Sequence, residues 1–223
     1  KTRKARKKHL YLAYSIQNYS KYAMITSNRN INCRGGFFLK TQFNIGNLEF
    51  SKPIVQGGMG IGISLSSLAG AVSKNGGLGV LSSVEMGCDY PNYKTNPKLA
   101  DRQALEDHFK RAKEISGNRP IGLNIMVALT QYEQIVKDAV EVGVDIIFAG
   151  AGLPLTLPEL TRNSATKIAP IISSKRVAKL LLKHWWRHYQ VVPDAIVLEG
   201  PLAGGHLGFK NEDLTPERLL EQK

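Results

Sequence analysis

The sequence predicts an α/β fold built on a parallel sheet, and three observations lead to this prediction. From residue 43 onward, six short apolar runs alternate with longer amphipathic stretches of helical periodicity. Each run is apolar throughout, as in strands that are buried on both faces of a parallel sheet. Each is followed by Gly, Ser or Asn close to its end. Strict alternation of this kind is typical of α/β folds, either barrels or doubly wound sheets.

The spacing of the runs favours the barrel. Successive runs begin about 28 residues apart, which suits a TIM (β/α)8-type barrel of roughly 250 residues. Only 25 residues follow Leu198, whereas two further units would need about twice that number. We therefore expect a barrel that is truncated after about six βα units.

The elements are expected in a regular order. The predicted strands are Pro53–Gln56, Leu78–Ser82, Ile121–Met126, Val144–Ala149, Ile168–Ile172 and Ala195–Leu198. The predicted helices are Leu65–Lys74, Ala100–Ile115, Gln131–Val142 and Lys175–Tyr189, with one more expected at Thr215–Gln222. In each of the first four helices, apolar residues recur three or four positions apart, which gives one face for the core.

The positive charge is concentrated at the beginning of the chain. The formal net charge is +12, yet residues 1–48 hold ten Lys or Arg and no acid, so the remainder is nearly neutral. We expect residues 1–42 to be a basic leader that is disordered or not native to the protein. A targeting segment or a nucleic-acid or membrane-surface arm is the alternative. No apolar run approaches the roughly 18 residues of a membrane span.

The cysteines and histidines do not predict a metal site. Cys33 and Cys88 are too few for a disulfide scaffold or a zinc cluster. Cys88 has no evident activating base, which favours a structural role. His184 and His188 have the spacing of two metal ligands on a helix, but no third ligand is evident, and a basic helix end is favoured.

Candidate functional residues follow the strands, because the active sites of barrels lie at the carboxyl ends of their strands. These positions hold Gln56–Gly60, Gly150–Gly152, Ser173–Ser174 and Glu199–Gly208, and Asn124 lies at the end of the third predicted strand. In the last loop, Gly204 and Gly205 allow close approach of a flat ligand. His206, which follows them, could take a proton from a substrate near neutral pH. A packing histidine in a tight turn is an equally weighted alternative.

Two further features leave alternatives open. Gly58, Gly60 and Gly62 suggest a dinucleotide-binding loop, but the fingerprint requires glycine where this chain has Ile63, which disfavours a Rossmann domain. Residues 89–97 (DYPNYKTNP) interrupt the repeat with turn-forming residues. They could form a lid over the site or a surface insertion.

Five motifs together resemble the nitronate monooxygenase family, formerly called 2-nitropropane dioxygenases, and its close relative, the FMN-dependent enoyl-acyl-carrier-protein reductase. They are PIVQGGMG (53–60), LAGAVSKNGGLG (68–79), GLNIM (122–126), AGAGLP (149–154) and EGPLAGGHLG (199–208). Each motif alone is weak, but the set occurs in the family's order over residues 43–215. The AGGHxG element is the most diagnostic.

The resemblance implies that residues 43–223 are an incomplete FMN-binding TIM-barrel domain. By position, Gly57, Gly58 and Met59 would line the flavin ring, Asn124 would hydrogen-bond it, and Glu199, Gly204 and Gly205 would contact the cofactor. The family often has Gln in place of Glu199. Because the family holds the FMN phosphate with loops after strands seven and eight, we expect this chain to hold FMN weakly.

The activity that the resemblance implies is oxidation of alkyl nitronates by O2 to a carbonyl compound and nitrite, with His206 as the catalytic base. The alternatives are an FMN-dependent NAD(P)H enoyl-acyl-carrier-protein reductase and an inactive fragment without flavin. The expected partners are a small nitronate or nitroalkane and O2, with no nucleic acid and no membrane. A homodimer is the assembly considered, and the expected location is the cytoplasm.

Overall fold

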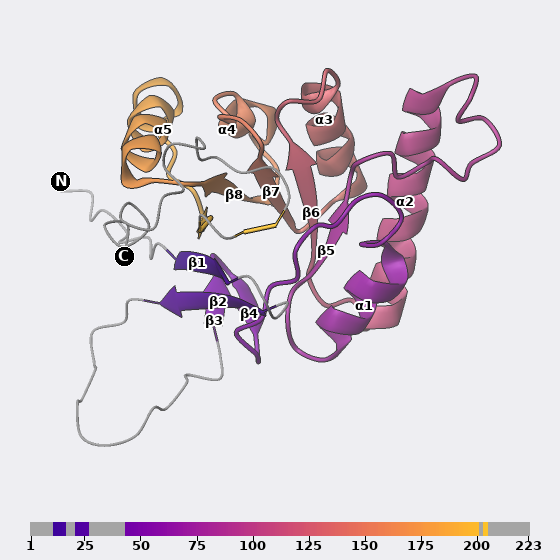
Figure 1. Cartoon of the computed structure of the whole chain (residues 1–223), viewed down its shortest axis with the longest axis horizontal. Coiled ribbons are helices and arrows are strands. Elements are labelled where there is room, and N and C mark those ends of the chain that lie inside the picture. The colour runs from indigo at the N-terminus through magenta and orange to yellow at the C-terminus, as the bar shows by residue number, and fades with distance from the viewer. Residues whose placement is uncertain (1–10, 17–20, 27–42, 201–202, 205–223) are drawn as a thin grey trace.

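A computed structural model of the chain describes residues 11–16, 21–26, 43–200 and 203–204. Its main element is a seven-stranded sheet in the order β2-β1-β9-β8-β7-β6-β5 (Figure 1). The strands β5 to β9 are parallel and follow one another in chain order; they are β5 (Gly79–Ser82), β6 (Ile121–Met126), β7 (Ile146–Gly150), β8 (Lys167–Ile172) and β9 (Ile196–Leu198). A doubly wound sheet reverses its strand order at a switch point. The uninterrupted order of these five strands is that of a barrel.

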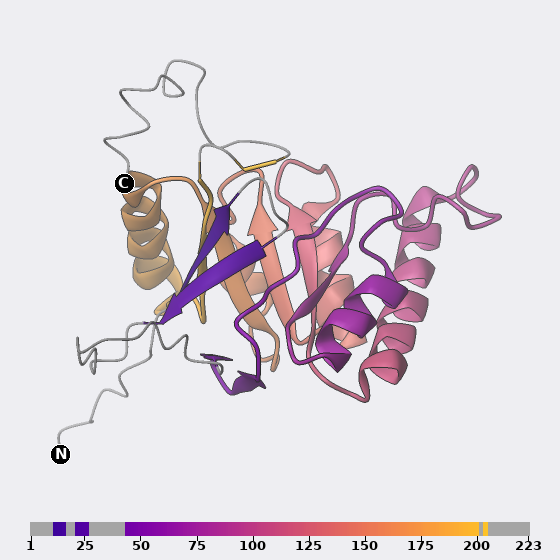
Figure 2. The same ribbon diagram turned by 60° about the horizontal axis from the view of Figure 1, so that its bottom comes forward.

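The helices lie outside the sheet, as Figures 1 and 2 show. They are α1 (Ser66–Lys74), α2 (Pro97–Ser116), α3 (Tyr132–Val142), α4 (Leu157–Leu160) and α5 (Lys175–Tyr189). The four longer helices agree with the predicted ones to within a few residues at each end. The single-turn helix α4 was not predicted, because four residues are too few to show a helical period.

Two clusters of buried side chains cover the two faces of the parallel strands. On the outer face, Leu81, Leu123 and Ile147 pack with side chains of the helices, among them the fully buried Trp185 of α5. On the inner face, Val80, Phe148 and Val197 pack with a short hairpin. These strands are therefore buried on both faces, which is why their sequences are apolar at consecutive positions.

The hairpin on the inner face was not predicted from the sequence. It consists of β3 (Phe43–Ile45) and β4 (Leu48–Phe50), joined by a two-residue turn in which Gly46 has φ of 60°. Phe43 and Phe50 stack across it, with ring centroids 4.7 Å apart. A Gly-Asn pair between short apolar runs is a hairpin signal, so the sequence did contain the information.

The first predicted strand is shorter than expected. Within residues 53–56 the structure has only one parallel bridge, between Val55 and Leu78. The prediction of a full strand at this position was wrong. Pro53 lacks a backbone N–H, and the chain turns into the glycine loop directly after Gln56, which leaves room for a single bridge.

Two further strands lie within residues 1–42. β1 (Tyr11–Ile16) and β2 (Lys21–Thr26) pair antiparallel, and β1 runs parallel to β9, beside the sixth predicted strand. The two strands thus extend the sheet beyond β9, and Figure 2 shows them in indigo. The sequence analysis predicted no strands here. The rest of this segment lies outside the described residues, and its disordered or non-native character stays a prediction. No helix among the described residues is long and apolar enough to cross a membrane.

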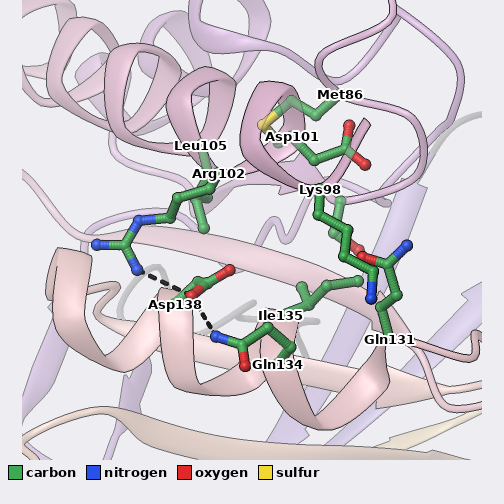
Figure 3. A pocket seen from close by; sticks show the side chains of 10 residues that line it. Met86, Lys98, Asp101, Arg102, Leu105, Gln131, Gln134, Ile135 and Asp138 are labelled. Atoms are coloured by element: carbon green, nitrogen blue, oxygen red, sulfur yellow. Dashed lines mark hydrogen bonds and ion pairs between the residues drawn. The ribbon is translucent and has the colours of Figure 1, made fainter. Parts of the chain in front are cut away.

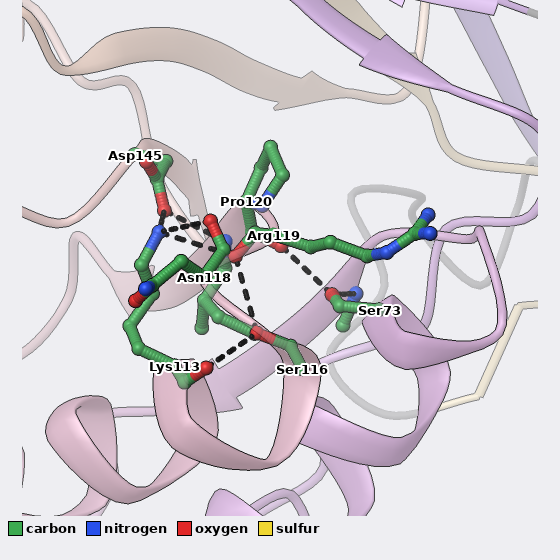
Figure 4. Close-up of polar contacts among 9 residues, drawn as sticks. Ser73, Lys113, Ser116, Asn118, Arg119, Pro120 and Asp145 are labelled. Carbon is green, nitrogen blue, oxygen red and sulfur yellow. Dashed lines mark hydrogen bonds and ion pairs between the residues drawn. The ribbon is translucent and has the colours of Figure 1, made fainter.

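Polar side chains close the amino ends of the strands (Figure 4). The carboxylate of Asp145 accepts a hydrogen bond from the backbone N–H of Ile121 at 2.8 Å and pairs with Lys113 at 3.1 Å. Asp194, just before β9, bonds in the same way to β8: its carboxylate accepts a hydrogen bond from the backbone N–H of Ile168 at 3.0 Å. Each carboxylate thus satisfies a backbone N–H at the beginning of a neighbouring strand.

Candidate functional site

The candidate site lies at the opposite, carboxyl ends of the strands, where the glycine loop after Val55 meets β5 and β6. A Cβ atom added at Gly58 would collide with the side chain of Asn124. One added at Gly60 would lie 3.3 Å from the Ser82 hydroxyl. Asn124 and Ser82 are register partners on neighbouring strands. The two glycines therefore allow the loop to lie directly on the polar ends of β5 and β6.

Asn124 retains hydrogen-bonding capacity at this point. Its side chain is half-buried, and its Nδ2 donates to the carbonyl oxygen of Phe148 at 3.5 Å, a long hydrogen bond. A carboxamide can donate two hydrogen bonds and accept two. Within the part of the chain that the structure describes, the other positions of this side chain stay available for a ligand.

Ser82 is a second polar group with unused capacity. The residue is 3% exposed, and its Oγ has no hydrogen-bond partner among the described residues. A buried hydroxyl without a partner costs free energy, and this one lies under the glycine loop, close to Gly60. Ser82 was not among the residues predicted for the site, because a serine that ends a strand looks like an ordinary turn residue.

Above the glycines, the loop exposes three apolar side chains: Met59 is 42% exposed, Ile61 51% and Ile63 56%. Single exposed apolar residues are common, but three on one loop beside polar groups form a surface of mixed apolar and polar character. Met59 is the member of this group that the sequence analysis placed at the site.

The loop after β9 is described only in part. The backbone N–H of Glu199 donates to the carbonyl oxygen of Ile172 at 2.7 Å, which fixes Glu199 to the end of β8. Ala203 is buried, and Gly204 is exposed beside it. Gly205 and His206 lie outside the described residues, so their places in the site stay predictions.

Of the remaining loop residues, Ser174 has a structural role. It is the N-cap of α5, and its hydroxyl accepts a hydrogen bond from the N–H of Val177 at 3.3 Å. The Gly150–Gly152 loop is exposed from Ala151 onward, and Ala151 and Gly152 both have positive φ. Its glycine at 152 packs against Val127 at the end of β6.

The segment 89–97 is tied to α2. The Tyr90 hydroxyl donates to Asp107 at 2.7 Å, and Asn92 donates to Gln103 at 2.9 Å. Burial and Asp107 raise the pKa of Tyr90 to about 12, so its hydroxyl stays protonated. Asn96 caps α2 by accepting from the N–H of Leu99 at 3.2 Å. These contacts favour the surface insertion over the lid.

Neither the thiol nor the paired histidines form a reactive centre. Burial, with Asp89 and Glu85 nearby, raises the pKa of the Cys88 thiol, which keeps it in the unreactive protonated form. The rings of His184 and His188 lie 4.4 Å apart on α5. No group of three His, Cys, Asp or Glu side chains among the described residues is arranged to hold a metal ion.

A small cavity lies apart from this site, between the beginnings of α2 and α3 (Figure 3). Lys98 and Gln131 lie at one end of it, and Arg102 and Asp138, paired at 2.9 Å, lie at the other. Its volume of about 30 Å³ would hold a water molecule or two. It is far too small for a flavin ring.

Comparisons with known proteins agree with the fold and the motifs. The family model described as nitronate monooxygenase matches residues 41–223. Among solved structures, FabK from Thermotoga maritima is 26% identical with a TM-score of 0.58, and the match covers 72% of this chain and 44% of FabK. A mutant form of FabK from the same organism is 21% identical with a TM-score of 0.53, over 74% and 49% of the two chains, a likeness of fold alone. No curated protein matches the chain significantly.

These matches confirm the predicted barrel-type fold. The chain spans less than half the length of the FabK chains that it matches.

Proposed function

Because the chain belongs to the nitronate monooxygenase family, we propose that it is part of an FMN-dependent oxidoreductase that oxidises alkyl nitronates with O2 to a carbonyl compound and nitrite. The observation that carries the proposal is the contact between the Gly57–Met59 loop and Asn124. It combines a backbone surface without side chains, an exposed Met59 and a carboxamide with unused hydrogen-bonding positions. These features suit a flat ring system with a polar edge, such as a flavin, which needs apolar contacts and a few placed polar groups.

The chain's own residues have distinct parts in this proposal. Gly57, Gly58 and Met59 would line the ring, and Asn124 would hydrogen-bond its polar edge. Glu199, Gly204 and Gly205 would contact the cofactor from the loop after β9, and His206 would take the acidic proton next to the nitro group. Bound FMN would supply the electron acceptor for the substrate and the electron donor for O2.

A second candidate function is supported by the same motifs. PIVQGGMG, LAGAVSKNGGLG and GLNIM resemble the FMN-dependent enoyl-acyl-carrier-protein reductase equally well, and the solved structures named above are FabK structures. In that activity, NAD(P)H would reduce the flavin, and an enoyl thioester would accept the hydride. The loop–Asn124 contact would serve both activities, since it concerns only the cofactor.

The deciding experiment is an anaerobic titration of the FMN-loaded chain, followed by its absorbance between 350 and 500 nm as an approximate window for oxidised flavin. We expect an alkyl nitronate to bleach this absorbance, and NADPH and NADH to leave it unchanged. Bleaching by the nicotinamides alone would contradict the nitronate activity and support the reductase. A chain that binds no FMN at any concentration tested would contradict both.

His206→Gln provides the matched control. The amide keeps the size and polarity of the imidazole but cannot act as a base near neutral pH. We expect this variant to bind FMN like the wild type and to be bleached by preformed nitronate, while losing activity toward the neutral nitroalkane. Equal activity of both proteins toward the nitroalkane would remove His206 from the mechanism.

The substrate and compartment are proposed with the activity. We propose a small nitronate or nitroalkane as substrate and the cytoplasm as location.

A further inference from the structure

We infer that Ser64 is a positioning residue for the flavin: its buried hydroxyl fixes the Gly57–Met59 turn in the shape that lies on Asn124. This inference rests on the proposed flavin function. Ser64 itself has no access to a ligand, since it is 0% exposed. Any effect of Ser64 on the cofactor must therefore pass through the loop.

The loop begins where the backbone leaves the sheet, at Gln56. The N–H of Gln56 donates to the carbonyl oxygen of Leu78 at 2.9 Å, the last backbone hydrogen bond of this segment to its neighbour. The next hydrogen bonds to this neighbour come from the Gln56 side chain. Its Nε2 donates to the carbonyl oxygen of Val80 at 2.9 Å, and its Oε1 accepts from the N–H of Val80 at 3.4 Å. The Gln56 amide thus replaces the next backbone unit of the ladder.

The Ser64 hydroxyl connects this amide to the loop. It accepts hydrogen bonds from Gln56 Nε2 and from the N–H of Met59, both at 2.9 Å. It donates to the carbonyl oxygen of Gly57 at 3.1 Å. A hydroxyl has one donor and two acceptor positions, so all three are used. One oxygen atom therefore sets the distance between the two ends of the Gly57–Met59 turn.

Ser64 also anchors the turn to the sheet through its backbone. Its N–H donates to the carbonyl oxygen of Met59 at 3.0 Å, and its carbonyl oxygen accepts from the N–H of Ser82 at 2.9 Å. Glycines in a loop have many accessible conformations, and none of them has a side chain to hold the turn. The hydrogen bonds of Ser64 therefore restrict the conformation of this turn.

A helix cap would be the ordinary role for a serine at this position, just before α1. The structure does not give Ser64 that role. The N-cap of α1 is Leu65, without a side-chain hydrogen bond to the helix, and the Ser64 hydroxyl bonds back to the loop. Its loss should therefore affect the loop first and the helix little.

Ser73 offers a matched control. It is also 0% exposed, and its hydroxyl also joins two backbone groups, donating to the carbonyl oxygen of Pro120 at 2.7 Å and accepting from the N–H of Gly79 at 2.8 Å. It lies at the amino ends of the strands, as Figure 4 shows. Ser64→Ala and Ser73→Ala therefore remove the same group from equally buried places at opposite ends of β5.

The experiment measures FMN affinity by fluorescence titration, and hydrogen exchange of single amides by NMR without FMN. We expect Ser64→Ala to raise the Kd for FMN about tenfold and to accelerate exchange at Met59. Ser73→Ala should leave the Kd within about twofold and accelerate exchange at Gly79 instead. Ser64→Cys, which keeps the volume but forms weaker hydrogen bonds, should change the Kd in the same direction if Ser64→Ala fails to fold.

Two results would overturn the role of Ser64 while leaving the flavin function intact. One is a wild-type Kd in Ser64→Ala, or in Ser64→Cys if only that variant folds. The other is an equal loss of FMN affinity in Ser73→Ala, which would show that general destabilisation is the cause. A wild-type chain that binds no FMN would instead overturn the proposed cofactor and this role together.

Discussion

The two ends of the parallel strands use their polar side chains in different ways. At the amino ends, Asp145, Asp194 and Ser73 each bond directly to backbone groups of neighbouring strands. At the carboxyl ends, the Ser82 hydroxyl has no partner among the described residues, and Asn124 has one long hydrogen bond. Polar groups that satisfy each other stabilise the fold, whereas a half-buried group with unused positions, such as Asn124, can bind a ligand. The amino ends therefore maintain the barrel, and the carboxyl ends serve the proposed site.

The largest expected effect is at the amino ends. In Gly79→Ala, the added methyl group would collide with the backbone carbonyl of Ala69 in α1, which cannot move independently of its helix. We expect a loss of about 3 kcal/mol in the free energy of unfolding, measured by urea denaturation. Gly117→Ala is the control: its φ of +68° is unfavourable for alanine but its surroundings are open, so about 1 kcal/mol should be lost. Equal losses would show that β5 and α1 can separate.

The next effect is at the carboxyl ends and concerns binding. In Gly58→Ala, the methyl group would meet the Asn124 side chain, so the loop must move away from β6. Because a misplacement of about 1 Å in a site can cost a factor of about one hundred, we expect the Kd for FMN to rise about that much. Stability should fall by only about 1–2 kcal/mol, since a loop shifts more easily than a helix.

Gly60→Ala should be milder, because the nearest atom to its added Cβ, on Val84, lies 3.1 Å away. If both alanine variants retained wild-type affinity for FMN, the close contact of loop and strand would have no part in binding.

Asn124→Ala separates binding from stability most directly. The side chain is half-buried and makes one hydrogen bond of 3.5 Å, so its removal should change the free energy of unfolding by less than about 0.5 kcal/mol. Loss of its hydrogen bond to the flavin should raise the Kd for FMN about tenfold. Thermal melting and fluorescence titration of the same sample measure both. A lower melting temperature with unchanged affinity would make Asn124 a structural residue.

The contrast between the ends also explains what the sequence could predict. The strands β5 to β9 were found because burial on both faces makes each of them apolar throughout, a pattern visible without the partners. Gly58 was found because it follows a predicted strand, and Asn124 because it lies near the carboxyl end of one. The sequence alone does not show why glycine is needed at position 58. The reason is its contact with Asn124, which is far away in the sequence and became visible only in the structure.

Ser64 and Ser82 could not be recognised in this way. Each serine is compatible with a cap or a turn, and only the positions of Gln56, Met59 and Gly60 around them show otherwise. The strands β1 and β2 were missed for another reason: they lie in the basic segment that was expected to be disordered or non-native. The pairing of β1 with β9 also joins the beginning of the chain to its last described strand. Long-range pairing has no local signal.

The smallest effect concerns Ser174, which lies at the carboxyl ends but accepts a hydrogen bond within its own helix. Ser174→Ala should lower the free energy of unfolding by about 1 kcal/mol, the usual value for a lost N-cap, and leave the Kd for FMN within about twofold. Ser174→Ala should thus change stability but not FMN affinity, whereas Asn124→Ala should change FMN affinity but hardly change stability. Measured side by side, the pair tests whether availability of a polar group, rather than its location at one end of the sheet, decides its function. A tenfold loss of FMN affinity in Ser174→Ala would show that location alone is sufficient.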